Sequence, residues 1–332
     1  MELSSIGLGT YLGTPDSDKD EAYLEAIQAF FIAGGNVFDT APNYRRGRSE
    51  LILGRAMEDF PREAVLLSTK VGYLPMGDAR RSEREPMEHW FHRVLERPGV
   101  VRPEDVVDGC HCLTPGYLMH QTGLSRINLR TDHIDLLHLH NPEHQRIHLG
   151  AVEFLDVMRR AFETCETMRL MGWIGAYGCA TWNGFRVGPM APNHLSLEEL
   201  FELATQVGGK DHGFRWIQAP LNLGMAEAYL MPTQSLGGVQ MTLLEAAQAL
   251  GLRVQTSASI LQGRILESIE PELCRKMGVR TPAQAALQFT RSCPGVEVAL
   301  VGMARHKHVL ENAELLDIPK IPPEFIPSIF ED

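Results

Sequence analysis

The chain has 332 residues, of which 44% are apolar and 22% are charged, with 30 glycines and 20 prolines. This composition is typical of a folded globular protein and excludes disordered, collagen-like and fibrous classes. Acidic residues outnumber basic ones by 42 to 31, which gives a net charge of −11. That charge argues against a nucleic-acid partner, because affinity for nucleic acid depends on Lys and Arg contacts to phosphate.

No apolar run approaches the roughly 18 to 20 residues of a membrane span, so no membrane partner is expected. The first residues lack the basic and apolar segments of a signal peptide. Six cysteines without an export signal are expected to be reduced thiols. We therefore expect a cytoplasmic protein, and its composition leaves open whether it is a monomer or a homo-oligomer.

Short β-branched runs alternate with longer amphipathic runs along the whole chain, which predicts alternating strands and helices. Strands are predicted at residues 6–10, 37–39, 65–70, 135–140, 173–179, 216–220, 253–257 and 298–301. Helices are predicted at residues 18–33, 49–58, 115–129, 152–170, 197–207, 241–250, 282–292 and 306–315. Asp18 is expected to start the first helix, and Thr281 followed by Pro282 is a typical helix start.

Eight strands, each followed by a helix, predict a parallel α/β sheet with right-handed crossovers. At this length, a single-domain (β/α)8 TIM barrel over residues 1–332 is favoured over an open doubly wound sheet. Residues 72–114 follow the third strand as a charged, proline-containing insertion with Trp90 and Phe91. On the catalytic face of a barrel, this aromatic patch would contact substrate or a second subunit; the alternative is a solvated loop with a short helix.

Four polar residues lie at or just after strand ends: Asp39, Tyr44, Lys70 and His140. The alternation of side chains along a strand places Ser68 with Lys70, and His138 with His140, on one face. Each residue alone has a structural explanation, as a loop cap, a core tyrosine or a hydrogen-bonded core histidine. Together, on successive strand ends of a barrel, they indicate an active site.

The four side chains suit proton transfer to or from a substrate oxygen. An ammonium beside a phenol is expected to lower the phenol pKa from its usual value near 10, and a carboxylate keeps the ammonium charged. His140 would orient the oxygen. Such a site protonates or deprotonates an oxygen while a hydride moves at the adjacent carbon.

Several segments resemble the aldo-keto reductase family. They are residues 33–44 (AGGNVFDTAPNY), 49–54 (SELILG), 68–70 (STK), 132–142 (DHIDLLHLHNP), 217–222 (IQAPLN) and 301–305 (VGMAR). The resemblance covers nearly the whole chain in the family's order. It implies a TIM barrel and NAD(P)H-dependent reduction of an aldehyde or ketone without a metal, with Asp39, Tyr44, Lys70 and His140, not His138, as the catalytic residues.

The same resemblance implies a nicotinamide cofactor, with NADP(H) favoured over NAD(H) because Arg305, Lys307 and His308 would hold a 2′-phosphate; a solvated helix start is the alternative. Gln218 would bind the carboxamide. The implied cofactor-binding residues are Thr10, Tyr11, Asp39, Thr181, Gln218, Ser259, Leu261, Gly302, Arg305, His308, Glu311 and Asn312.

The sequence departs from the family in the cofactor pocket. After the fifth strand it has Gly178-Cys179-Ala180-Thr181, so Ala180 offers no side-chain hydrogen bond to a carboxamide. Where an aromatic residue stacks on the nicotinamide in the family, this chain has Ala258. These departures predict a nicotinamide ring that is held less firmly than in the family.

Two other functions fit the same residues. A barrel that binds nicotinamide as a sensor or scaffold would tolerate the altered pocket, and a redox-neutral isomerase or lyase could use Tyr44 and Lys70 as acid and base. Cys110-His111-Cys112 with His120 lacks the paired spacing of a zinc site, so no metal is expected. The sequence does not identify the carbonyl substrate.

Overall fold

The computed structural model describes residues 1–75 and 85–330, and it contains a closed barrel of eight parallel strands. The order around the barrel is β1-β10-β9-β6-β5-β4-β3-β2. The strands are β1 (Ile6–Gly9), β2 (Val37–Asp39), β3 (Leu66–Val71), β4 (Ile134–His140), β5 (Ile174–Ala180), β6 (Phe214–Pro220), β9 (Arg253–Ser257) and β10 (Val296–Gly302). All eight predicted strands are confirmed within one or two residues, and so is the TIM barrel.

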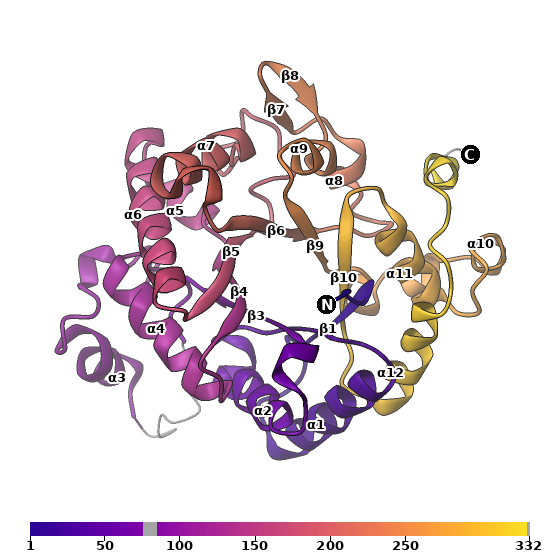
Figure 1. Cartoon of the computed structure of the whole chain (residues 1–332), viewed down its shortest axis with the longest axis horizontal. Helices are drawn as coiled ribbons and strands as arrows, with labels where there is room; N and C mark the ends of the chain where they lie inside the picture. Colours follow the sequence, from indigo (N-terminus) through magenta and orange to yellow (C-terminus); the bar gives the residue numbers. More distant parts are fainter. Residues whose placement is uncertain (76–84, 331–332) are drawn as a thin grey trace.

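Helices surround the barrel on its outer side (Figure 1). The eight that follow the prediction are α1 (Ser17–Ile32), α2 (Arg48–Met57), α4 (Pro115–Asn128), α6 (Ala151–Leu170), α7 (Leu197–Gly208), α9 (Leu243–Ala249), α11 (Pro282–Ser292) and α12 (His306–Ala313). Thr281 caps α11 by accepting the backbone N–H of Gln284, as predicted. Helix α1 begins slightly earlier than expected, because the Asp16 side chain accepts the N–H of Lys19.

Among the described residues, four short α-helices and one two-stranded hairpin lie outside the predicted elements, and the first of these helices is the one that the alternative for the insertion allowed. They are α3 (Met87–Phe91), α5 (Glu143–His148), α8 (Glu227–Leu230), α10 (Pro271–Lys276) and the hairpin of β7 (Gln234–Leu236) and β8 (Val239–Met241). The hairpin turns at Gly237 and Gly238, whose φ angles are +56° and +82°. Two positive φ angles suit the tight turn of a two-residue hairpin, and glycine adopts them without steric cost.

The barrel interior has an apolar layer and a polar layer. Val37, Leu66, Leu136, Trp216, Val298 and Leu300 form a buried apolar cluster between the strands. Further along the same strands, the inward-facing residues are polar, and these include Ser68, Lys70, His138, Gln218 and Gln255. The predicted strand faces are therefore confirmed, and the polar layer lies toward the carboxyl ends of the strands, where barrel active sites occur.

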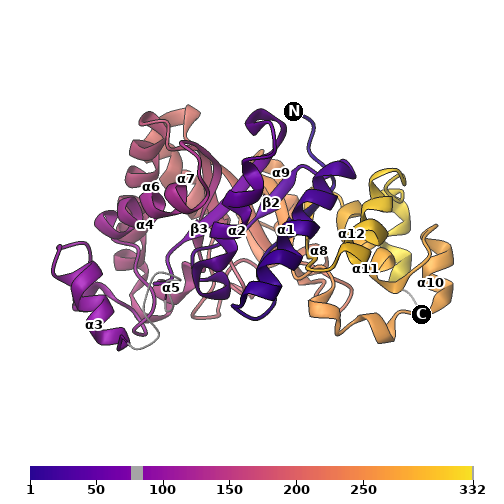
Figure 2. The same ribbon diagram turned by 90° about the horizontal axis from the view of Figure 1, so that it is seen from below.

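The described part of the insertion, residues 72–75 and 85–114, does not present the predicted aromatic patch. Trp90 is only 2% exposed and belongs to the main apolar core together with Leu95 and Val101. Helix α3 stands at one margin of the molecule, on the opposite side from α10 (Figures 1 and 2). The prediction that Trp90 belongs to an exposed patch is wrong, because its ring is buried with the apolar side chains of the main core.

Candidate active site

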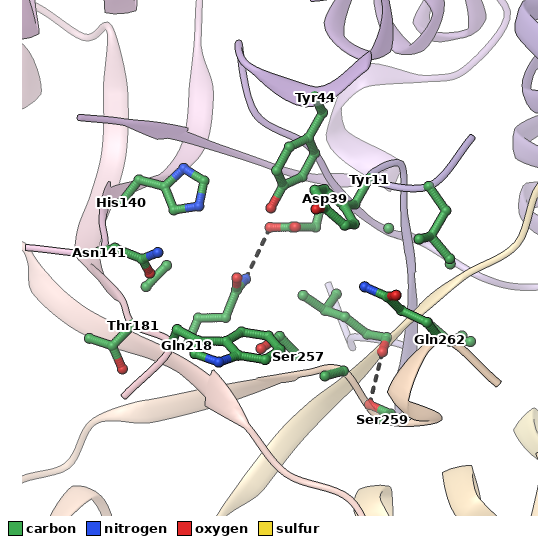
Figure 3. A pocket seen from close by; sticks show the side chains of 18 of the residues that line it. Tyr11, Asp39, Tyr44, His140, Asn141, Thr181, Gln218, Ser257, Ser259 and Gln262 are labelled. Atoms are coloured by element: carbon green, nitrogen blue, oxygen red, sulfur yellow. Dashed lines mark hydrogen bonds between the residues drawn. The ribbon is translucent and has the colours of Figure 1, made fainter. Parts of the chain in front are cut away.

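A cavity of about 490 Å³ opens at the carboxyl ends of the barrel strands. Of the predicted site residues, it is lined by Tyr11, Asp39, Tyr44, His140, Thr181, Gln218, Ser259, Leu261 and Gly302. The side chains of Tyr44, His140 and Gln218 are directed into this space (Figure 3). The structure therefore brings together predicted site residues from both ends of the chain, from Tyr11 to Gly302.

Lys70 lies behind Asp39 and is almost completely buried. Its Nζ donates to Asp39 Oδ2 at 2.5 Å and to the carbonyl oxygen of Thr40 at 2.9 Å. The same Nζ is 4.9 Å from the centre of the Tyr44 ring. Burial opposes the charge of Lys70, but Asp39 and Tyr44 outweigh it, so the pKa of Lys70 is raised. Lys70 is thus an ammonium group held between a carboxylate and a phenol, as the sequence predicts.

The pKa of Tyr44 is raised above its usual value of 10.0, mainly because the phenol is buried. Lys70 acts in the opposite direction, but its effect is the smaller one. The expectation that Lys70 gives a lowered pKa is therefore wrong in direction, because it omitted the cost of burying a phenolate. Tyr44 consequently carries its proton at neutral pH and is able to donate it.

His140 faces Tyr44 across the cavity, with 6.0 Å between the ring centres. Burial, followed by the nearby charge of Lys70, lowers the pKa of His140 well below 6.5. The imidazole is therefore neutral at physiological pH, with one nitrogen that donates and one that accepts. Its backbone carbonyl contacts Nε2 of His111 at 2.7 Å, which fixes the end of strand β4.

A chain of amide and imidazole groups fixes the orientation of Gln218. Its Nε2 donates to Asp39 Oδ1 and to Gln255 Oε1, both at 3.1 Å. Gln255 Oε1 also contacts Nε2 of His138 at 3.1 Å. Because the amide nitrogen of Gln218 is engaged in this way, its Oε1 is left to accept a hydrogen bond from a ligand. His138 belongs to this internal chain and does not line the cavity.

The remaining predicted cofactor residues do not line this cavity. The Thr10 hydroxyl is buried and donates to Thr40 Oγ1 at 2.8 Å. Arg305 and His308 are exposed at the start of α12, directly after β10. Glu311 accepts a hydrogen bond from Thr281 Oγ1 at 2.6 Å, and Asn312 Oδ1 is buried without a hydrogen-bond partner among the described residues.

The end of β9 and the loop after it have small residues where the family resemblance implies an aromatic residue that stacks on the nicotinamide. Ser257 and Ala258 both line the cavity, and Ala258 has a φ angle of +56°. Ser257 is the last residue of β9 and lies two positions from the inward-facing Gln255, so its side chain is on the cavity side. Ser257 is thus the better position for a stacking ring than Ala258, where a bulky residue would be strained.

Some lining residues were not predicted as site residues: Asn43, Tyr73, Asn141, Trp182 and Gln262. Tyr73 packs edge-on against His140, with 4.9 Å between ring centres, and its hydroxyl contacts His144 Nε2 at 2.9 Å. Asn141 Nδ2 donates to the same hydroxyl at 3.1 Å. Asn43 and Asn141 occur within the motifs quoted above, whereas Tyr73 belongs to none of them and follows Gly72, whose φ angle is +145°.

Within residues 1–75 and 85–330, no cluster of three or more His, Cys, Asp or Glu side chains has the geometry to hold a metal ion. Over those residues, no helix combines the length and the apolar character that a bilayer crossing requires.

A closed parallel barrel with a polar cavity at the carboxyl ends of its strands has the architecture of barrel enzymes. The model of the Aldo/keto reductase family matches residues 5–191, more than half of the chain. The protein therefore belongs to the aldo/keto reductase family and is an NAD(P)-dependent oxidoreductase, which confirms the resemblance seen in the sequence.

Individual relatives are distant. D-threo-aldose 1-dehydrogenase from Pseudomonas sp is 26% identical over 326 residues, covering 90% of this chain and 85% of the relative. NADH-specific methylglyoxal reductase from Escherichia coli is 41% identical over 77 residues, covering 22% of this chain and 24% of the relative. An aldo/keto reductase from Klebsiella pneumoniae, solved with NADP and acetate, superposes with a TM-score of 0.67 at 20% identity, covering 98% of this chain and 90% of that one.

Proposed function

We propose that the protein reduces an aldehyde or ketone to an alcohol with NAD(P)H, and that Tyr44 is the proton donor. The observation that carries this proposal is the buried contact of Lys70 with Asp39 beside a protonated Tyr44 that faces His140. Lys70 stabilises the phenolate that remains after proton transfer, and Asp39 keeps Lys70 charged. Neutral His140 donates a hydrogen bond to the carbonyl oxygen and so fixes its position between the two rings.

The residues around the cavity fit a nicotinamide nucleotide. Gln218 Oε1 faces the cavity as an acceptor for the carboxamide N–H, and Thr181 Oγ1 lies nearby without a partner among the described residues. Asn312 Oδ1, also unpartnered there, would accept from an adenine amino group. Exposed Arg305, Lys307 and His308 at the N-terminus of α12 would contact phosphate. When bound, the nucleotide supplies the hydride.

NADP(H) is proposed as the preferred nucleotide, because three basic side chains lie at the proposed phosphate end. The Klebsiella pneumoniae structure was solved with NADP, whereas the Escherichia coli relative is NADH-specific, so both nucleotides occur among similar proteins. Titration of the protein with NADPH and NADH, followed by Arg305→Ala, tests it. Weaker binding of NADPH with unchanged binding of NADH in this variant supports the proposal, and equal losses contradict it.

The test of Tyr44 is the variant Tyr44→Phe, which keeps the ring and removes the hydroxyl. We expect turnover of an aldehyde panel to fall about 10² to 10⁴-fold, the usual contribution of a positioned acid, with nucleotide affinity unchanged. Undiminished turnover would reject Tyr44 as the donor. Nucleotide binding without turnover in the unmodified protein would favour the sensor or scaffold function, and interconversion of substrate without nucleotide oxidation would favour an isomerase or lyase.

A further inference from the structure

The residues directly after Tyr44 have an unusual backbone. Arg45 and Arg46 have φ angles of +48° and +57°, in the left-handed region that glycine prefers. Two consecutive residues with side chains in this region are energetically costly, and such conformations persist where surrounding contacts enforce them. The contacts of Arg45 show what enforces the conformation here.

The Arg45 side chain is completely buried, and most of its donors have partners on another segment of the chain. Nη2 donates to Asp20 Oδ1 at 2.6 Å. Nε and Nη2 both donate to the carbonyl oxygen of Thr14, at 3.1 and 3.0 Å. The guanidinium lies over the ring of Tyr23, 5.0 Å from its centre. Arg45 therefore joins the loop of Tyr44 to helix α1 and to the loop that precedes it.

This junction connects two walls of the cavity. The loop held by Arg45 begins with Tyr11, which lines the cavity and packs edge-on against Tyr44 with 4.9 Å between ring centres. The Ser49 hydroxyl, just beyond the strained residues, donates to the carbonyl oxygen of Thr10 at 2.7 Å. Arg48 contacts the second carboxylate oxygen of Asp20. The segment that carries Tyr44 and the loop that carries Tyr11 are thus both linked to the buried carboxylate of Asp20.

We propose that Arg45 and Asp20 are positioning residues for proton transfer: their buried ion pair holds the Tyr44 hydroxyl in line with Lys70 and His140. This inference rests on the proposed role of Tyr44 as proton donor. Asp20 neutralises the charge of Arg45, so the pair acts through the placement of Tyr44 and Tyr11. A reacting group displaced by about 1 Å loses roughly 10²-fold in rate, which sets the scale of the effect.

The sharpest test is Arg45→Gly. Glycine adopts the left-handed conformation without steric cost, so this variant removes the ion pair and relieves the local backbone strain. We expect kcat to fall about 10- to 100-fold, a larger change than any in nucleotide affinity. Arg46→Gly is the matched control, because Arg46 has the same backbone conformation and an exposed side chain. Its kcat should stay at the wild-type value.

The pH profile separates positioning from a general loss of stability. A looser loop exposes Tyr44 to water, and burial is the main cause of its raised pKa. The alkaline loss of reduction in Arg45→Gly should therefore move to lower pH. Arg62→Met removes a different ion pair, in which Arg62 Nη2 lies 2.6 Å from Asp135 Oδ2 near the start of β4. It should lower Tm and leave both kcat and the pH profile unchanged.

Two further variants keep the test decisive if Arg45→Gly does not fold. Asp20→Asn should lower kcat in the same way, and Arg45→Lys should recover part of it because it keeps the charge. The inference is overturned if these variants have a lower Tm but the kcat and the pH dependence of the wild type. If instead Tyr44→Phe itself keeps full turnover, the proposed function fails before this inference is tested, so the two failures are distinguishable.

Discussion

Lys70 Nζ lies 2.5 Å from Asp39 Oδ2 inside the barrel, where the two side chains are 1% and 5% exposed. Both side chains are largely buried, so each charge depends strongly on the other, although Asp39 also borders the cavity. Removing one partner of such a pair leaves an uncompensated buried charge, which costs about 3–5 kcal/mol. This pair therefore contributes to both folding and chemistry, because it also supplies the ammonium beside Tyr44.

We expect Lys70→Met to lower the free energy of unfolding by that amount and to abolish reduction. Denaturant titration and a turnover assay measure the two effects. Adding Asp39→Asn to this variant should recover part of the stability, since it removes the unpaired carboxylate, but no activity. A double variant no more stable than Lys70→Met would show that the loss comes from packing and not from charge.

The pH dependence of reduction follows from Tyr44 and His140. Tyr44 must be protonated to donate, and its pKa is raised above 10.0, so the rate should decline only above about pH 10. The pKa of His140 is lowered well below 6.5, so no loss is expected as pH falls through 6.5. The value of kcat/KM should therefore stay nearly constant between pH 6.5 and about pH 10. An alkaline midpoint near neutral pH would show that Lys70 outweighs burial.

Two buried histidines should make the fold sensitive to acid. Burial lowers the pKa of His111 and of His138 to about 4, whereas the unfolded chain titrates near 6.5. Between pH 6.5 and 4 the unfolded chain therefore binds more protons, and the free energy of unfolding falls as pH falls through this window. Across this whole window, each histidine lowers the free energy of unfolding by about 3 kcal/mol.

Chemical denaturation at several pH values measures this slope. His138→Gln keeps a donor toward Gln255 and removes the titrating group, so its slope should be shallower than that of the wild type. His89→Gln, at an exposed position, is the control and should leave the slope unchanged. Equal slopes in all three proteins would contradict the assignment of acid sensitivity to the buried imidazole.

Nucleotide binding should depend mainly on contacts to the phosphate groups, because Ser257 and Ala258 are too small to stack on the nicotinamide ring. Affinity measured by calorimetry should therefore fall as salt rises, since exposed charge contacts are screened. Ser257→Tyr should tighten binding, because stacking contributes about 1–3 kcal/mol in related base–aromatic contacts. Ala258→Tyr is the comparison, and its φ angle of +56° should prevent the same gain. Salt-independent affinity would contradict this account of the pocket.

Much of the barrel was predictable from the sequence, because its determinants are local. Buried strands read as short β-branched runs, and polar residues such as Asp39, Lys70 and His140 stand out where those runs end. The identity of the family followed from the same segments, since the motif residues lie close together along the chain. Gln218 was predicted for this reason, although its partners Gln255 and His138 were not.

What the sequence did not reveal depends on contacts between distant segments and on backbone conformation. The pKa of Tyr44 is decided mainly by how deeply the fold buries it. Trp90 is buried in the main apolar core, although the charged residues around it in the sequence suggest a surface segment. Tyr73 lines the cavity directly after Gly72, whose φ angle of +145° no motif in the sequence indicates. Arg45 resembles a surface residue in the sequence, yet in the fold its guanidinium is buried 2.6 Å from Asp20, and this contact holds a left-handed backbone. Only tertiary packing fixes such φ angles and burial, so only the folded chain decides them.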